Sequence, residues 1–247
     1  MSLVDNTAAL RSLLSLVNDL PDASLELQGD MTYYVSSSGS DDNDGSQSAP
    51  FKTFGKALSV FPKNLGGHKA TIQALSDISE SISVNYFYNG VLELNMGSYT
   101  LTGKIAAMNV LAFLKLYGNT YTAVSGSSAR VLQFESCISA TLYPYSGTTI
   151  TINCSGGPGV YANSSNVFFT ASSTHGVVFN DSSYCVYAKA ANVAFGGSLT
   201  FNTANIAIAA QQAAFISCNA SPTFTSVTSK YAYQGGIIAT GATLNPT

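Results

Sequence analysis

Two acidic residues in the second half of the sequence are the best candidates for catalytic chemistry. Glu135 and Asp181 are the only acids after residue 94. Glycoside hydrolysis commonly uses a pair of carboxylates, up to about 9.5 Å apart in inverting enzymes. The 46 residues between them would span two coils of a repeat with a period of about 23 residues, a separation of roughly 9.6 Å. Both acids fall where strands should end, with His175 nearby, so solvated turn carboxylates are favoured over a catalytic pair.

Other groups that bind metals or attack substrates are sparse. The acidic stretch SDDNDG at 40–45 fails the EF-hand template, because Gly45 at position 6 would place Phe51 at position 12. We expect a turn whose Asx side chains bond the local backbone, with no metal and no cofactor. A calcium-dependent lyase would need more carboxylates. The four cysteines are far apart and are predicted to be buried free thiols made in a reducing compartment: Cys137, Cys154, Cys185 and Cys218.

Tyrosines suggest a different kind of site. A ring face beside hydroxyl and amide groups can bind a sugar. The low-charge second half carries six tyrosines that serve as candidate ligand-binding residues: Tyr143, Tyr145, Tyr161, Tyr187, Tyr231 and Tyr233. The alternative is that tyrosine, a good strand residue, packs against its neighbours or against other subunits, and general burial preferences favour that alternative.

Composition excludes several partner classes. Charged residues make up 9% of the 247 residues and the net charge is −3, against a usual charged share of about 25%. This balance provides no basic field, so nucleic acid is not an expected partner. No apolar run reaches the roughly 18 residues that a membrane helix needs, and the N-terminus has no basic segment typical of a signal peptide.

The elements that position these residues recur along the chain. GVYANSSNVFF at 159–169 and CVYAKAANVAF at 185–195 match at six of eleven positions. Similar runs continue at 205 and 230 and predict four stacked columns: Val160, Val186, Ile206 and Tyr231; Phe169, Phe195 and Phe215; Phe179, Phe201 and Phe224; Asn166, Asn192 and Gln212. The period and the short β-type runs between polar turns predict an all-β parallel solenoid of roughly seven coils over residues 84–240. Residues 69–85 fit either a first coil or a helix.

One segment carries a family resemblance. The stretch YYVSSSGSDDNDGSQSAPFKTFGKAL at 33–58 matches a family pattern at Tyr34, Val35, Ser36, Gly39, Ser40, Asp41, Asn43, Asp44, Gly45, Pro50, Phe51, Thr53, Ala57 and Leu58. It resembles the opening of pectate-lyase-like right-handed parallel β-helix domains. The resemblance implies that fold for residues 26–247, with a cap helix near 53–62 over its N-terminal end. Enzymes, adhesins and viral tailspikes share the fold, so it does not choose among them.

Residues 1–25 are predicted to contain a separate amphipathic helix. Leu3, Leu10 and Val17 repeat every seven residues, Leu13 and Leu20 form a second line, and Pro21 ends the segment. A lone helix of this length is marginal in water, so its leucines must be buried. They pack either against the following domain or against copies of themselves, which makes 1–25 a candidate oligomerisation segment.

This organisation resembles bacteriophage and prophage tail appendages, and the stretch NTAALRSLLSLVNDLP at 6–21 resembles the short helix that precedes such domains in structural proteins of phages of Gram-positive gut bacteria. The resemblance implies a non-enzymatic tail spike or fibre-like adhesin, homo-oligomeric with a trimer favoured, assembled in the bacterial cytoplasm and located in the virion tail. Its expected partner is a cell-surface glycan. The alternative is a polysaccharide-degrading hydrolase or lyase on the same fold, and a third hypothesis is a passive spacer.

Overall fold

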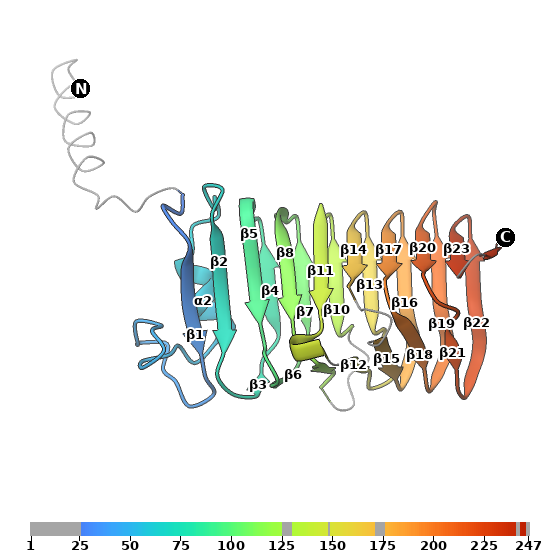
Figure 1. Cartoon of the computed structure of the whole chain (residues 1–247), viewed down its shortest axis with the longest axis horizontal. Helices are drawn as coiled ribbons and strands as arrows, with labels where there is room; N and C mark the ends of the chain where they lie inside the picture. Colours follow the sequence, from blue (N-terminus) through green and yellow to red (C-terminus); the bar gives the residue numbers. More distant parts are fainter. Residues whose placement is uncertain (1–25, 125–129, 148, 171–175, 241–242, 246–247) are drawn as a thin grey trace, which may run out of the picture.

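The chain winds into an elongated parallel β-solenoid, with its strands perpendicular to the long axis (Figure 1). The computed structural model describes residues 26–124, 130–147, 149–170, 176–240 and 243–245. The predicted all-β solenoid is therefore confirmed. The predicted helix within 1–25 lies outside the described residues.

Three sheets form the walls of the solenoid, and each coil contributes one strand to each sheet. Sheet A contains, in spatial order, β1 (Met31–Val35), β2 (Lys69–Ala74), β5 (Tyr88–Asn95), β8 (Leu111–Tyr117), β11 (Ser139–Tyr143), β14 (Asn166–Phe169), β17 (Asn192–Phe195), β20 (Phe215–Cys218), β23 (Ile237–Thr240) and β24 (Thr243–Asn245). Sheet B contains β3 (Ile78–Ser79), β6 (Thr100–Thr102), β9 (Thr120–Thr122), β12 (Ile150–Asn153), β15 (Gly176–Asn180), β18 (Ser198–Phe201) and β21 (Thr223–Phe224). Sheet C contains β4 (Ile82–Asn85), β7 (Ile105–Met108), β10 (Leu132–Glu135), β13 (Val160–Asn163), β16 (Ser182–Lys189), β19 (Ala204–Gln211) and β22 (Val227–Gln234).

The two similar eleven-residue segments at 159–169 and 185–195 lie in adjacent coils. Val160 pairs with Val186 in sheet C, and Asn166 pairs with Asn192 in sheet A, both 26 residues apart. Residues 69–85 form β2, β3 and β4, which settles the open choice in favour of a first coil. Seven coils therefore run from β2 to β22. Similar residues recur because each coil presents the same neighbours to the next one.

Aromatic columns fill the interior, as predicted, but one of them is interrupted. Phe169 stacks on Phe195 with ring centroids 4.5 Å apart. The next position in that column is Cys218, because Phe195 pairs with Cys218 in β20. The prediction that Phe215 continues the column was wrong: Phe215 pairs with Asn192 and its side chain is 39% exposed.

The other three predicted columns had mixed outcomes. Phe179, Phe201 and Phe224 stack with centroids 5.4 and 5.5 Å apart, which confirms that column. Val186 pairs with Ile208 rather than Ile206, so the valine column was predicted two residues out of register in β19. Asn192 donates to Asn166 at 2.8 Å, but Gln212 lies in the following turn and does not extend this ladder.

A second asparagine ladder, which the sequence analysis did not predict, follows the ends of the sheet B strands. The Asn180 amide donates to Asn153 Oδ1, and the Asn202 amide donates to Asn180 Oδ1, both at 2.7 Å. Asn153 in turn donates to Thr122 Oγ1 at 3.2 Å. Asn153 and Asn180 thus each donate to the preceding coil and accept from the following one, which satisfies polar groups at the corner between sheets B and C.

A short helix covers the N-terminal end of the core, as predicted. Helix α2 (Phe54–Val60) packs against β1, β2 and β4 (Figure 1). Thr53 caps it by accepting the Lys56 amide at 3.0 Å. The Glu80 carboxylate accepts the amides of Phe54 and Gly55 at 2.8 and 2.9 Å, so a negative charge lies at the positive end of the helix.

Aspartate side chains in the acidic loop before α2 accept hydrogen bonds from nearby backbone amides, as the turn interpretation predicted. Asp41 Oδ1 accepts the Lys52 and Thr53 amides at 3.0 and 2.9 Å, and Oδ2 accepts the Thr53 hydroxyl at 3.0 Å. Asp44 accepts the Ser46 amide at 2.8 Å, a bond that lowers the pKa of that carboxyl. These carboxylates stabilise the turn that carries the chain from β1 into the cap helix.

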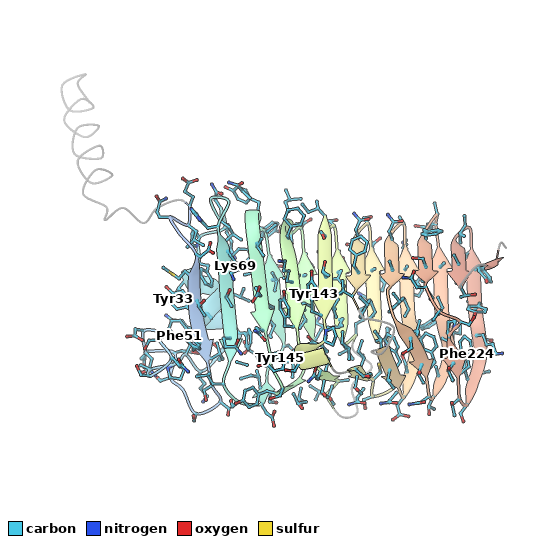
Figure 2. The ribbon with its side chains drawn as sticks, in the orientation of Figure 1. Tyr33, Phe51, Lys69, Tyr143, Tyr145 and Phe224 are labelled. Atoms are coloured by element: carbon cyan, nitrogen blue, oxygen red, sulfur yellow. The ribbon has the colours of Figure 1, made fainter. Side chains whose placement is uncertain are left out.

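Aromatic side chains cover the opposite end of the core. Tyr231 and Tyr233 of β22 pair with Ile208 and Ala210, which are buried interior residues, so both rings face inward. Tyr231 contacts Phe224 edge-to-face at 5.7 Å and lies 6.3 Å from Tyr233. Phe224 lies in this last coil, far from α2 (Figure 2). The half-buried rings therefore shield the C-terminal end.

All four cysteines are buried free thiols, as predicted. Burial raises the thiol pKa of Cys154 and Cys218 to about 12, from 9.0. Above pH 9 the unfolded chain therefore binds fewer protons than the native chain, and stability must fall as pH rises.

We expect the urea midpoint to decrease as pH rises from about 8 toward about 12, because unfolded thiols ionise around pH 9 while the buried thiols stay protonated up to about pH 12. Denaturation monitored by circular dichroism measures it. A Cys154→Ala/Cys218→Ala variant is the matched control and should show a shallower decline. An equally steep decline in that variant would contradict the assignment to these thiols.

Candidate functional site

The two acidic candidates lie at opposite ends of the sheet C strands, Glu135 at the C-terminal end of β10 and Asp181 just before the N-terminal end of β16. Glu135 ends β10 and is in register with Asn163 and, one coil further, with Lys189. Asp181 precedes Lys189 by eight residues, which is about 26 Å along an extended strand. Inverting glycosidases hold their carboxyl groups about 6.5–9.5 Å apart. The structure does not bring these two carboxylates together into an acid–base pair.

Each of these acids also has a local structural role. Glu135 Oε1 accepts the Gln133 side-chain amide and lies 3.4 Å from Arg130 Nη1. Asp181 occupies a turn with φ of 52°, a conformation that Asp tolerates, and its carbonyl accepts the Gly156 amide at 2.9 Å. Among the described residues, no three His, Cys, Asp or Glu side chains gather as a metal-binding group. No helix in the described ranges is long and apolar enough to cross a membrane.

Two candidate tyrosines form a stack on the outer face of sheet C. The rings of Tyr161 and Tyr187 are 5.4 Å apart and nearly parallel. The Arg130 guanidinium lies over the Tyr161 ring, 3.5 Å from its centroid. Tyr184 contacts Tyr187 edge-on at 5.6 Å, and the Tyr187 hydroxyl donates to Gln211. Because these groups contact one another's rings, little ring face is left for a sugar.

The remaining tyrosines divide between the core and sheet A. Tyr231 and Tyr233 face the interior, so they do not belong to an outer binding surface. Tyr145 begins the short 3-10 helix η1 (Tyr145–Gly147) and is 39% exposed. Tyr143 lies on the outer face of sheet A, in the middle of the solenoid (Figure 2), and stacks on Tyr117 at 4.7 Å.

An open groove of about 370 Å³ lies beside Tyr143 on this face. We call it the sheet A groove; it is lined by Phe168, Phe169, Thr170, Ala194, Phe195, Gly196 and Asn219. Phe169 points into the core, so the adjacent residue of β14, Phe168, points outward. Its ring is 40% exposed and forms an aromatic wall of the groove. Its register partner Ala194 and the neighbouring Gly196 are small, which leaves the space in front of the ring open.

Polar groups follow the same face in register. Thr170 lies one coil from Tyr143, because Leu142 pairs with Phe169, and its amide bonds the Leu142 carbonyl at 3.0 Å. The Gly196 amide bonds the Phe169 carbonyl at 2.8 Å, and the Asn219 amide bonds the Phe195 carbonyl at 3.0 Å. The sheet A groove thus combines an exposed ring with the Thr170 hydroxyl and the Asn219 side-chain amide, which donate to the Leu142 and Gly196 carbonyls at 3.1 and 3.4 Å. None of its described lining residues is charged.

In comparisons with known proteins, no family model, no curated protein and no solved structure matches this chain.

Tyr143, a predicted candidate, is not among the residues that line the groove, and Phe168, which does line it, was not predicted. The run NVFF at 166–169 held a usable signal, because consecutive phenylalanines in a strand must point to opposite faces. Once Phe169 is placed in the interior column, Phe168 must be outside. Asn219 and Thr170 follow strands in turns, where polar residues are common, so their types alone gave no comparable signal.

Proposed function

We propose that this chain is a non-enzymatic adhesin that binds neutral cell-surface glycans in the sheet A groove. The observation that carries the proposal is the exposed Phe168 ring beside small residues and uncharged polar groups. Sugars present alternating apolar C–H faces and hydroxyl groups, which suit an aromatic wall with amide and hydroxyl partners. An uncharged lining favours neutral over acidic glycans, which would leave their charges without a partner.

The biological setting of the proposal is the tail of a bacteriophage or prophage. Support comes from the pectate-lyase-like resemblance at 33–58, from the resemblance of the leading segment to those of phage structural proteins, and from the solenoid itself. A tail spike or fibre-like role with a homotrimeric assembly fits this combination. Within that role, the solenoid presents the groove at a fixed place along a stiff rod.

We expect Phe168→Ala to weaken glycan binding by about five- to thirtyfold, because the ring face supplies apolar contact worth about 1–2 kcal/mol. Wild-type protein on an array of neutral and acidic bacterial glycans identifies the probe, and titration calorimetry then measures both proteins. Phe215→Ala is the matched control, since Phe215 is an equally exposed phenylalanine of sheet A outside the groove. Equal affinity for wild type and Phe168→Ala would place binding elsewhere.

The same glycan separates the adhesin from its alternatives. Size-exclusion chromatography of the glycan after incubation should show no shortening by the wild-type protein. If the wild type does shorten it and Glu135→Gln or Asp181→Asn abolishes this, the chain is an enzyme and the proposal fails. An array without any bound glycan would favour a spacer that binds nothing.

A further inference from the structure

An exposed apolar surface lies at the corner where sheet C leads into sheet A. This corner strip consists of Tyr86, Tyr88, Leu111, Phe113 and Ile138, which are 63%, 44%, 57%, 57% and 45% exposed. Four of these residues are connected by register: Tyr88 pairs with Leu111, Phe113 follows on the same face, and Phe113 pairs with Ser139, the neighbour of Ile138. Tyr86 precedes Tyr88 by two residues. Contiguous exposed apolar residues usually mark an interaction site.

The strip is confined to the first coils. Its next positions along the solenoid are Asn166 and Asn192, whose side chains bond each other, and the Asn166 amide also bonds the Ile138 carbonyl at 3.0 Å. The apolar surface therefore has a polar boundary after Ile138. Its occupant must cover the N-terminal coils and need not extend further.

The chain preceding residue 26 joins the solenoid at this same corner. Glu26 bridges to Asn64, and Asn64 bridges to Tyr88. The Leu27 amide bonds the Asn64 carbonyl at 3.0 Å, and the Leu111 amide bonds the Phe87 carbonyl at 2.8 Å. Glu26, Asn64, Tyr88 and Leu111 thus occupy successive strand levels, which places the junction of residues 1–25 beside the strip.

We propose that residues 3–20 of the same chain dock on the corner strip as an amphipathic helix. The four strand spacings between the level of Glu26 and the level of Ile138 measure about 19 Å. An 18-residue helix is about 27 Å long, so it is long enough to cover this distance. Pro21 and the four residues after it can span up to about 17 Å, enough for the chain to turn back along the solenoid. The lines of Leu3, Leu10, Val17 and of Leu13, Leu20 supply the apolar face.

Covalent attachment favours this occupant over a separate molecule. A short connection gives the segment an effective local concentration of the order of millimolar at the strip. Docking buries leucines that a lone helix would expose, and such a helix is only marginally stable by itself. The same leucines would then be unavailable for a coiled coil between copies, so any oligomer of this chain would form through other surfaces.

Hydrogen exchange of the full chain tests the proposal. In Leu111→Ser/Phe113→Ser, amides of residues 3–20 should exchange about tenfold faster or more than in the wild type, because the docked state loses its apolar partner. Phe215→Ser/Ile237→Ser is the matched control: these two exposed apolar residues also belong to sheet A, on adjacent strands at its other end. There, exchange of residues 3–20 should stay within about twofold of the wild type.

Protein concentration separates docking from self-association. Exchange of residues 3–20 in the wild type should stay constant over about a hundredfold dilution, because docking within one chain does not depend on concentration. Faster exchange on dilution would overturn the proposal in favour of a bundle of copies. Unprotected amides in the wild type, or equal protection in the corner-strip variant, would overturn it as well. None of these outcomes depends on whether the sheet A groove binds a glycan.

Discussion

Replacing Phe201 with alanine is expected to lower the free energy of unfolding by about 3–5 kcal/mol. Phe201 is fully buried between Phe179 and Phe224, whose ring centroids lie 5.4 and 5.5 Å away. Alanine would leave a cavity between two rings. The cavity cannot close easily, because backbone hydrogen bonds fix the spacing of adjacent strands at about 4.8 Å. Most of the cavity cost should therefore remain.

Phe215→Ala is the matched control for the core prediction. Phe215 is 39% exposed on sheet A, so its loss should cost less than about 1 kcal/mol. Urea denaturation followed by circular dichroism measures both variants, with the slope compared to verify a single transition. Similar losses for the two variants would contradict the register that places Phe201 inside and Phe215 outside.

The repeat was predictable from sequence because a solenoid imposes the same environment on each coil. That constraint kept Phe179, Phe201 and Phe224 at spacings of 22 and 23 residues, and all three lie in one column. It also kept Val160 and Val186 in register. Strand content and coil number followed from the period and the turns alone.

Register in the sixth coil was not predictable, for a physical reason. NIAIAAQ at 205–211 has isoleucines at both 206 and 208, and a strand period of two cannot distinguish them. The turn after β19 then has one more residue than the turn after β16: Gln211 to Phe215 spans four steps, and Lys189 to Asn192 spans three. Gln212 and Ala213 in this turn both have positive φ. Phenylalanine tolerates either face, so matching Phe215 to Phe195 by type failed.

The candidate site was less predictable than the fold. Residue type identified the tyrosines as candidates for ring stacking but did not predict which face of the sheet each side chain occupies. In the structure the Tyr143 side chain lies on the outer face and the Tyr233 side chain on the inner face. The distance between Glu135 and Asp181 depended on which end of sheet C each occupies. Coil spacing gives only the component along the solenoid axis, and the larger component runs along the strands.

Gly103→Ala is expected to destabilise the protein by about 2–5 kcal/mol, from left-handed backbone strain of about 1–2 kcal/mol and overpacking of about 1–3 kcal/mol. Gly103 has φ of 145°, and a Cβ there would lie 2.0 Å from the Glu80 carbonyl oxygen. The obstacle is backbone, held in place by the bond from the Glu80 amide to the Thr102 carbonyl at 3.0 Å. It cannot yield by rotating a side chain.

The effect of Gly103→Ala should extend to the cap helix. Glu80 also accepts the first amides of α2, so displacing its backbone pulls the carboxylate away from Phe54 and Gly55. Gly156→Ala is the control, because Gly156 has φ of 81° but no atom lies within 4 Å of an added Cβ. It should lose only the backbone term, about 1–2 kcal/mol. Thermal denaturation with hydrogen exchange of residues 54–60 measures both effects: α2 should lose protection in Gly103→Ala alone, and equal loss in both variants would contradict the contact with Glu80.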